Sequence, residues 1–108
     1  MEFEDLISFI NKQDKRLREQ YGNYPDEEKR VLARTVKLAE EFGELCDEVL
    51  AYNSMQRKDK LDKIVDGNLA EEFADVIITT LLLAKVMEVD IEKVKKVAER
   101  GEGYRRTM

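Results

Sequence analysis

The feature that most restricts the fold is the segment 76–86, where apolar side chains do not keep to one face of a helix. At about 100° of turn per residue, its valine, isoleucine, leucine and alanine side chains cover nearly the whole circumference. A helix that is apolar all round must be buried all round. The segment is interrupted by Thr79, Thr80 and Lys85 and is too short to cross a bilayer. One chain of 108 residues can hardly enclose it, so the sequence predicts a homodimer or homotetramer with this helix at the interface.

The rest of the chain also has helical periodicity. No stretch alternates apolar and polar residues with period two for long enough to predict a strand. In the first helix, the inner stripe is expected to consist of Phe3, Leu6, Ile7, Ile10 and Leu17. A polar connector with room for a short helix around 61–65 is expected over 53–67. The periodicity predicts four main helices, over about 3–20, 26–52, 68–88 and 90–101.

Local signals mark several helix ends. Pro25 separates the first two helices, because proline breaks a helix. Asn68 followed by Glu71 has the spacing of a capping box at the start of the third helix. Asp90 can cap the fourth helix, and Gly101 is a typical C-terminal glycine. The sequence therefore predicts an all-α fold, a four-helix bundle.

Composition excludes several classes of function. The chain 1–108 has the length of a single domain, and 43% hydrophobic residues are enough for a core. The net charge of −5 disfavours nucleic acid and anionic membranes as partners. The chain has no histidine, which excludes imidazole-dependent metal sites and catalytic triads. A metal must then be bound mainly by oxygen, which favours magnesium, manganese or calcium.

Two features favour a cytoplasmic protein. The one cysteine, Cys46, cannot form a disulfide within the chain and suits a reducing compartment. The N-terminus is acidic and lacks the basic-then-apolar shape of a signal peptide.

Two similar acidic motifs lie on the second and third expected helices. The first reads Leu-Ala-Glu-Glu-Phe-Gly-Glu-Leu over 38–45, and the second reads Leu-Ala-Glu-Glu-Phe-Ala-Asp-Val over 69–76. In each motif, two acids three residues apart share a helix face beside the apolar stripe. These pairs are Glu41 with Glu44 and Glu72 with Asp75.

These acids have two interpretations. Acids at this spacing usually belong to solvated helix faces. That interpretation fits Glu72 and Asp75 less well, because an entirely apolar run follows them without a loop. Burying one unpaired carboxylate costs on the order of several kcal/mol, and facing acids repel each other. A divalent cation would remove both costs, and salt bridges from Lys37 or Lys85 are the alternative.

The complete pattern is Glu-Glu-x-x-Glu, then 27 residues, then Glu-x-x-Asp, all on apolar helices. This pattern resembles the MazG-like all-α nucleoside triphosphate pyrophosphohydrolases. The resemblance spans about Lys37 to Ile91, and the order of helices agrees outside it. It implies hydrolysis of a nucleoside or deoxynucleoside triphosphate to the monophosphate and pyrophosphate, with Mg²⁺ as cofactor and Mn²⁺ as the alternative.

The resemblance also implies roles for individual acids. In such families the second and third acids of the first motif bind magnesium together with both acids of the second motif. Carried over, these ligands are Glu41, Glu44, Glu72 and Asp75. Glu40 would be an accessory ligand or the base that takes a proton from the attacking water, a role that Glu41 could also fill.

Basic residues near the C-terminus are the candidates for binding the substrate phosphates. They are Lys93, Lys96, Arg100, Arg105 and Arg106, of which Lys96, Arg100 and Arg105 are the main candidates. Secondary candidates on the second helix are Arg30, Arg34 and Lys37. Many relatives carry a Lys/Asn/Arg set after the fourth helix. In this chain only an arginine, Arg105, can be matched to that set, and the asparagine has no counterpart.

Two other functions stay open at this point. The first is phosphoribosyl-ATP pyrophosphohydrolase, a related enzyme that resembles this fold and metal arrangement and acts on a different nucleotide. A non-catalytic helical module would use the apolar third helix for oligomerisation alone. The sequence does not identify a preferred base or sugar.

Overall fold

The computed structural model describes residues 2–20, 27–57 and 66–106. Within these residues it contains helices, short turns and no strand, which confirms the all-α prediction. The helices are α1 (Phe3–Gln20), α2 (Glu27–Arg57), α3 (Asp66–Val86), α4 (Ile91–Arg100) and α5 (Glu102–Arg106).

The C-terminal end of α2 and the N-terminal end of α3 both extend further than the sequence predicted. α2 continues to Arg57 because residues 53–57 contain no glycine or proline and include good helix formers. α3 begins at Asp66. The predicted start of this helix at Asn68 is therefore two residues late. The expected helix start at 26 and the short helix around 61–65 lie outside the described residues.

Both predicted ends of α4 are confirmed. The Asp90 side chain accepts a hydrogen bond of 3.0 Å from the backbone N–H of Glu92. Gly101 has φ 64, which glycine adopts without the steric cost of a Cβ, and its N–H donates to the carbonyl of Val97. All four predicted helices are present, and the described residues add one that was not predicted, the short helix α5, which Arg105 N–H closes by bonding back to the Gly101 carbonyl.

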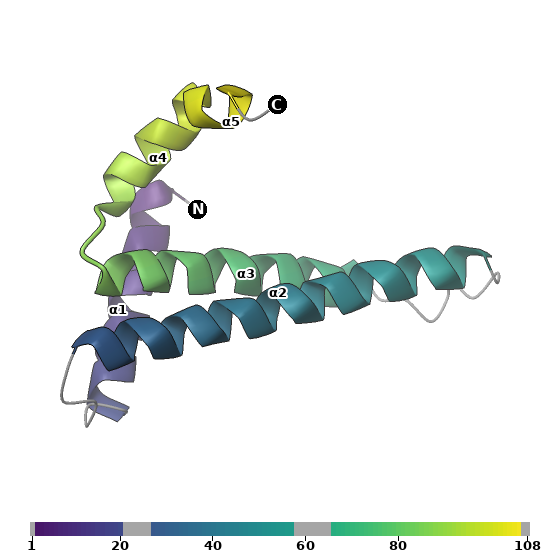
Figure 1. The fold of residues 1–108 in the computed structure, drawn as a ribbon, viewed down its shortest axis with the longest axis horizontal. Coiled ribbons are helices and arrows are strands. Elements are labelled where there is room, and N and C mark those ends of the chain that lie inside the picture. Colours follow the sequence, from purple (N-terminus) through teal and green to yellow (C-terminus); the bar gives the residue numbers. More distant parts are fainter. Residues whose placement is uncertain (1, 21–26, 58–65, 107–108) are drawn as a thin grey trace.

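The long helices α2 and α3 run antiparallel and side by side (Figure 1). α1 crosses them near one end, and α4 leaves that same end and extends away from the pair (Figure 1). This arrangement sets the middle of α2 against the first half of α3, where the two acidic motifs lie. No helix in the described part of the chain is long and apolar enough to span a membrane.

The core lies where α1, α3 and α4 meet. Its buried residues are Ile10 from α1, Leu82 from α3 and Ile91 at the start of α4. Partly buried apolar side chains surround them, and those from α1 are the four other members of the predicted inner stripe, Phe3, Leu6, Ile7 and Leu17. The stripe of α1 is therefore confirmed.

A single chain does not enclose α3. Its Phe73 and Ile77 side chains are 51% and 53% exposed. α2 also exposes large apolar side chains, which are Leu32, Val36, Phe42, Val49 and Leu50. Exposed apolar surface of this kind is typical of interaction sites. The oligomer interface at α3 stays a prediction.

A buried ionic cluster connects α1, α2 and α3. Arg34 Nη1 donates a hydrogen bond of 2.8 Å to the carbonyl of Leu82. The same atom lies 2.8 Å from Asp14 Oδ1, without the alignment of a hydrogen bond. Asp14 Oδ2 accepts a hydrogen bond of 3.0 Å from Arg18 Nε. Arg34 and Asp14 are both buried, so each charge depends on the other for compensation.

The end of α3 contains a strained residue. The N–H of Val89 bonds to the carbonyl of Ala84, and the N–H of Glu88 bonds to the carbonyl of Lys85, which is the pattern of a Schellman motif. The position of Glu88 in this motif usually holds glycine, and Glu88 has φ 60. A left-handed conformation costs a residue with a Cβ about 1–2 kcal/mol.

We expect Glu88→Gly to raise the free energy of unfolding by about 1 kcal/mol, because it removes this strain. Chemical denaturation would measure the change. Glu88→Ala is the control, since alanine keeps the strain and removes only the carboxylate. Equal stabilisation by both variants would show that the carboxylate, and not the backbone, is the cause.

We expect Arg34→Met to lower the free energy of unfolding by about 2–3 kcal/mol, because Asp14 would keep a buried charge with less compensation. Arg18 is the other cation that pairs with Asp14, and the Arg18 side chain is 44% exposed. Arg18→Met should therefore lower the free energy of unfolding by less than about 1 kcal/mol. Denaturation of both variants gives the comparison. A smaller loss in Arg34→Met than in Arg18→Met would contradict the assignment of the central role to Arg34.

Candidate metal centre

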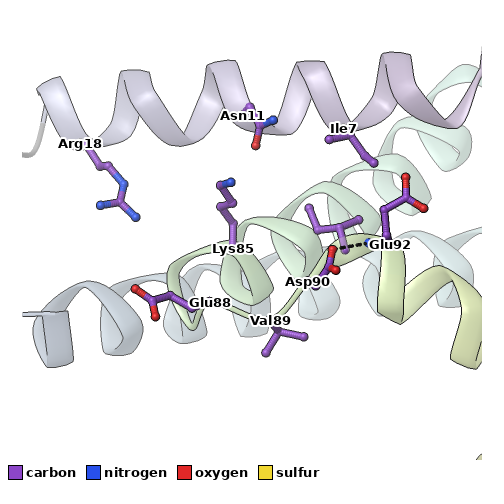
Figure 2. Close-up of a pocket in the computed structure, with 9 residues that line it drawn as sticks. Ile7, Asn11, Arg18, Lys85, Glu88, Val89, Asp90 and Glu92 are labelled. Atoms are coloured by element: carbon purple, nitrogen blue, oxygen red, sulfur yellow. Dashed lines mark hydrogen bonds between the residues drawn. The ribbon is translucent and has the colours of Figure 1, made fainter.

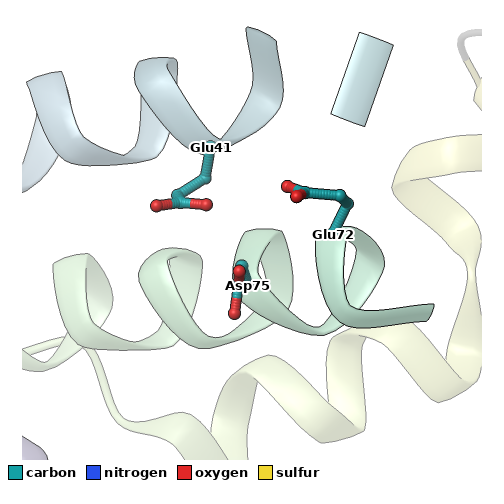
Figure 3. A group of neighbouring side chains, drawn as sticks. All are labelled: Glu41, Glu72 and Asp75. Carbon is teal, nitrogen blue, oxygen red and sulfur yellow. The ribbon is translucent and has the colours of Figure 1, made fainter. Parts of the chain in front are cut away.

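Three carboxylates meet where α2 packs against α3. Glu41 comes from α2, and Glu72 and Asp75 come from successive turns of α3 (Figure 3). One oxygen from each carboxylate lies within 4.8 Å of the others. Figure 3 shows the carboxylates of Glu41 and Glu72 extending toward each other across the helix contact. The packing of α2 on α3 thus brings together three of the four predicted metal ligands.

Local sequence explains why each acid faces this contact. Glu72 and Asp75 are three residues apart, so they lie on the same side of α3. Leu69 and Val76, which are partly buried, flank them on that side. Thr79 continues the face by one turn, and its hydroxyl donates to the carbonyls of Asp75 and Val76 at 2.8 and 3.2 Å. The Thr79 proton is therefore used within the helix.

Two carboxylate oxygens of the cluster are buried without a hydrogen-bond partner among the described residues. They are Glu41 Oε2 and Glu72 Oε2. Glu41 is only 7% exposed as a residue, whereas Glu72 and Asp75 keep some contact with solvent. Buried polar atoms are normally paired, so these two oxygens are suited to accept a cation.

Electrostatic repulsion is evident at Glu72. Its pKa is raised above the ordinary value of 4.5, chiefly because the carboxylate loses solvation. The charges of Glu44, Asp75, Glu41 and Glu48 raise it further, in that order. Glu72 thus resists ionisation while no cation is present to offset these charges.

One cation contacts the cluster from its edge. Lys37 Nζ lies 3.1 Å from Glu41 Oε1, one helical turn away, and 3.7 Å from Glu40. The hydrogen bond to Glu41 is the main reason that the pKa of Lys37 is raised. The pair leaves the second oxygen of Glu41 unsatisfied, so Lys37 does not neutralise the whole cluster.

The donor set fits a hard divalent cation. All three groups offer carboxylate oxygen, which Mg²⁺ and Mn²⁺ prefer. Adjacent ligands of an octahedral Mg²⁺ are about 3 Å apart and opposite ones about 4.2 Å, so the three oxygens, within 4.8 Å of one another, would have to move closer together to bind one ion. A dication would also partner the two unsatisfied oxygens.

The other predicted acids lie beside the cluster. Glu44 is exposed on α2 and is not one of the three clustered residues. Its charge nevertheless has the second-largest effect on the pKa of Glu72, so it is close enough to act electrostatically. Glu40 is exposed and its carboxylate faces Lys37.

The predicted phosphate-binding residues lie on the C-terminal helices. Lys96 and Arg100 are exposed on α4, and Arg105 is exposed on α5. Arg100 Nε donates to the carbonyl of Lys96, and the Arg105 guanidinium donates to the carbonyl of Arg100. These residues therefore contact one another, on helices that extend away from the α2–α3 pair (Figure 1).

A separate open pocket of about 430 Å³ lies between α1, the end of α3 and the start of α4. Its polar lining includes Asn11, Arg18, Lys85, Glu88 and Glu92 (Figure 2). Lys85 is ten residues beyond Asp75, or about 15 Å along α3. The pocket is thus distinct from the carboxylate cluster.

The sequence predicts only secondary roles for Lys37, as a possible salt-bridge partner of the acids or a secondary phosphate-binding residue. It does not predict the specific pairing of Lys37 with Glu41. The signal was present, because residues four apart on a helix are neighbours. What the sequence could not show is that Glu41 is the buried acid of its motif.

Fold and site together define a class of all-α proteins with carboxylates clustered between two antiparallel helices. The family model of the MazG nucleotide pyrophosphohydrolase domain matches residues 30–101, more than half of the chain. The chain therefore belongs to the MazG nucleotide pyrophosphohydrolase domain family. The match includes both acidic motifs and nearly all of α2, α3 and α4. No curated protein and no solved structure matches the chain.

The raised pKa of Glu72 predicts how the metal-free protein responds to pH. At a pH above the pKa of Glu72 in the folded state, this residue is charged in both the folded and the unfolded states. Only in the folded state does the charge suffer lost solvation and repulsion from the neighbouring acids. Stability should rise as the pH falls through the folded pKa toward 4.5, because the folded state binds the proton first. We expect Glu72→Gln to be more stable than the wild type at pH 7.5 and to lose this advantage near pH 4.5.

Urea denaturation in the presence of a chelator, repeated across this pH range, would measure the difference. Glu71→Gln is the matched control, because Glu71 is the adjacent, exposed acid of the same motif. The same pH-dependent advantage in both variants would show that general charge, and not the cluster, is responsible.

Proposed function

We propose that this chain is a magnesium-dependent nucleoside triphosphate pyrophosphohydrolase, which converts a nucleoside or deoxynucleoside triphosphate to the monophosphate and pyrophosphate. Membership of the MazG family supports hydrolysis of a nucleotide anhydride. The observation that carries the metal dependence is the convergence of Glu41, Glu72 and Asp75, with two of their oxygens buried and unsatisfied. Mn²⁺ has the same ligand preference and should also support activity.

Glu41, Glu72 and Asp75 would hold the cation, and Glu44 would join them by a change of side-chain rotamer. A bound Mg²⁺ supplies charge neutralisation at the triphosphate and lowers the pKa of a coordinated water. The protein must then provide a proton acceptor beside that water. Glu40 and Glu41 are the candidates, and Glu40 is the more available because it is exposed and not part of the three-acid cluster.

The reaction proposed is attack of water on the α-phosphorus with pyrophosphate as the leaving group, as in the family. The negative charge of that leaving group requires cations. Lys96, Arg100 and Arg105 are our proposed phosphate ligands, and backbone-directed hydrogen bonds from the two arginines hold these residues close together on α4 and α5. Arginine suits this role because its guanidinium can bind two phosphate oxygens at once.

The active form is proposed to be a homodimer or homotetramer that acts in the cytoplasm as a single-domain enzyme. The exposed apolar side chains of α2 and α3, such as Phe42, Phe73 and Ile77, support assembly through this pair of helices.

We expect Glu41→Gln, Glu72→Ala and Asp75→Asn each to lower Mg²⁺-dependent pyrophosphate release by about 100-fold or more, because each removes a charged metal ligand. Glu72→Ala should leave a folded oligomer, since it also removes a repelling charge. Asp47→Asn is the control, because Asp47 is an exposed acid of α2 outside the cluster. Wild-type activity in Glu72→Ala would reject the site.

The assay should screen ordinary and deoxy nucleoside triphosphates with detection of released pyrophosphate. Size-exclusion chromatography of the same variants separates catalysis from assembly. A purely structural oligomerisation module would give unchanged oligomers and no turnover in any of them, including the wild type.

A further inference from the structure

The ion pair between Lys37 and Glu41 has a feature that a simple surface salt bridge lacks. Its two partners are in different environments, because the Lys37 side chain is 58% exposed and that of Glu41 is 9% exposed. The lysine therefore approaches a buried carboxylate from solvent. Its long side chain can leave without any change in the helix that carries it.

The pair satisfies only part of the site. Glu41 Oε1 faces Lys37 at 3.1 Å, while Glu41 Oε2 is buried without a partner among the described residues. Two other acids near Lys37 are on the same helix, α2. Glu40 lies 3.7 Å from the ammonium group, and the charge of Glu44 also raises the pKa of Lys37. Glu72 and Asp75 face Glu41 from α3. The single positive charge of Lys37 therefore cannot neutralise all the carboxylates of the site.

We propose that Lys37 is a displaceable counter-ion of this site, which pairs with Glu41 while no metal is bound and contacts the substrate's phosphate oxygens once a divalent cation occupies the carboxylates. This inference rests on the proposed function. When the charge of Glu41 is offset by a dication, the attraction that holds Lys37 at Oε1 falls, and repulsion between the two cations favours its release. The phosphate oxygens of a bound triphosphate would then be the negatively charged groups that attract the Lys37 ammonium.

Two effects of Lys37 on metal affinity oppose each other, and their sizes differ. The hydrogen bond to Oε1 fixes the orientation of Glu41, which would help a metal to bind. The ammonium, however, is carried by a long, exposed and flexible side chain, so it restrains the orientation of Glu41 little. The repulsion between an ammonium and a dication that share one carboxylate is stronger than that restraint, so removal of Lys37 should strengthen metal binding.

The test compares the wild type with Lys37→Met, which removes the ammonium and keeps most of the side-chain length. Isothermal titration with Mg²⁺ alone at low ionic strength should give about threefold to tenfold tighter binding in Lys37→Met. Titration with inorganic tripolyphosphate at saturating Mg²⁺ should give about tenfold weaker binding in the same variant. Tripolyphosphate has no base or sugar, so it reports contacts with phosphate only.

Two further variants serve as controls. Lys37→Arg keeps a cation at the position and should resemble the wild type in both titrations. Lys95→Met removes the same charge and breaks another exposed pair four residues apart, Lys95 with Glu99 at 2.9 Å on α4. It should change neither affinity, because Lys95 does not contact the carboxylate cluster.

The outcomes separate this inference from the proposed function. Unchanged or weaker Mg²⁺ binding in Lys37→Met, with normal binding in the wild type, overturns the displaceable counter-ion and leaves the metal site standing. Tighter Mg²⁺ binding with unchanged tripolyphosphate affinity overturns the contact with phosphate. No Mg²⁺ binding in the wild type overturns the metal site, and with it this inference.

Discussion

Carboxylates that face each other across the α2–α3 contact repel one another, and the folded chain holds them there all the same. Glu41 contributes a nearly buried acid, and Glu72 and Asp75 contribute two more from the opposite helix. The apolar packing of α1, α3 and α4 lies toward the other end of α3 and supplies stability that this contact cannot. A dication bound among these carboxylates would offset the repulsion. The raised pKa of Glu72 reflects chiefly the lost solvation of its carboxylate and, after it, this repulsion.

Sequence patterns predicted the features that depend on neighbouring residues. The inner stripe of α1, the N-cap Asp90 and the left-handed Gly101 all follow from local rules, and all three are confirmed. The two acidic motifs also carried the family resemblance, which the family match confirms. Spacing on a wheel grouped Glu41 with Glu44 but could not show that the first is buried and the second is exposed.

Features that depend on tertiary packing were missed. The buried partnership of Arg34 with Asp14 joins residues on different helices, and nothing in either helix indicates it. Glu88 in a left-handed conformation contradicts the usual preference for glycine at the end of a helix, so no sequence rule would place a Schellman motif there. The start of α3 was misplaced by two residues, because the capping pattern predicted a start at Asn68 and the helix begins at Asp66. Tertiary packing supplies most of the stability of a helix, so local patterns fix its ends only approximately.

The hydrogen bond from Arg34 to the carbonyl of Leu82 has a consequence for alignment of the two long helices. Glu41 follows Arg34 by seven residues, and Asp75 precedes Leu82 by seven. Because α2 and α3 are antiparallel, the same stagger that joins Arg34 to Leu82 also sets Glu41 opposite Asp75. A slip of one helix along the other by a single turn, about 5.4 Å, would break the first contact and misalign the second. The hydrogen bond between Arg34 and Leu82, two turns away, thus fixes the axial position of α2 relative to α3 and keeps the carboxylates aligned.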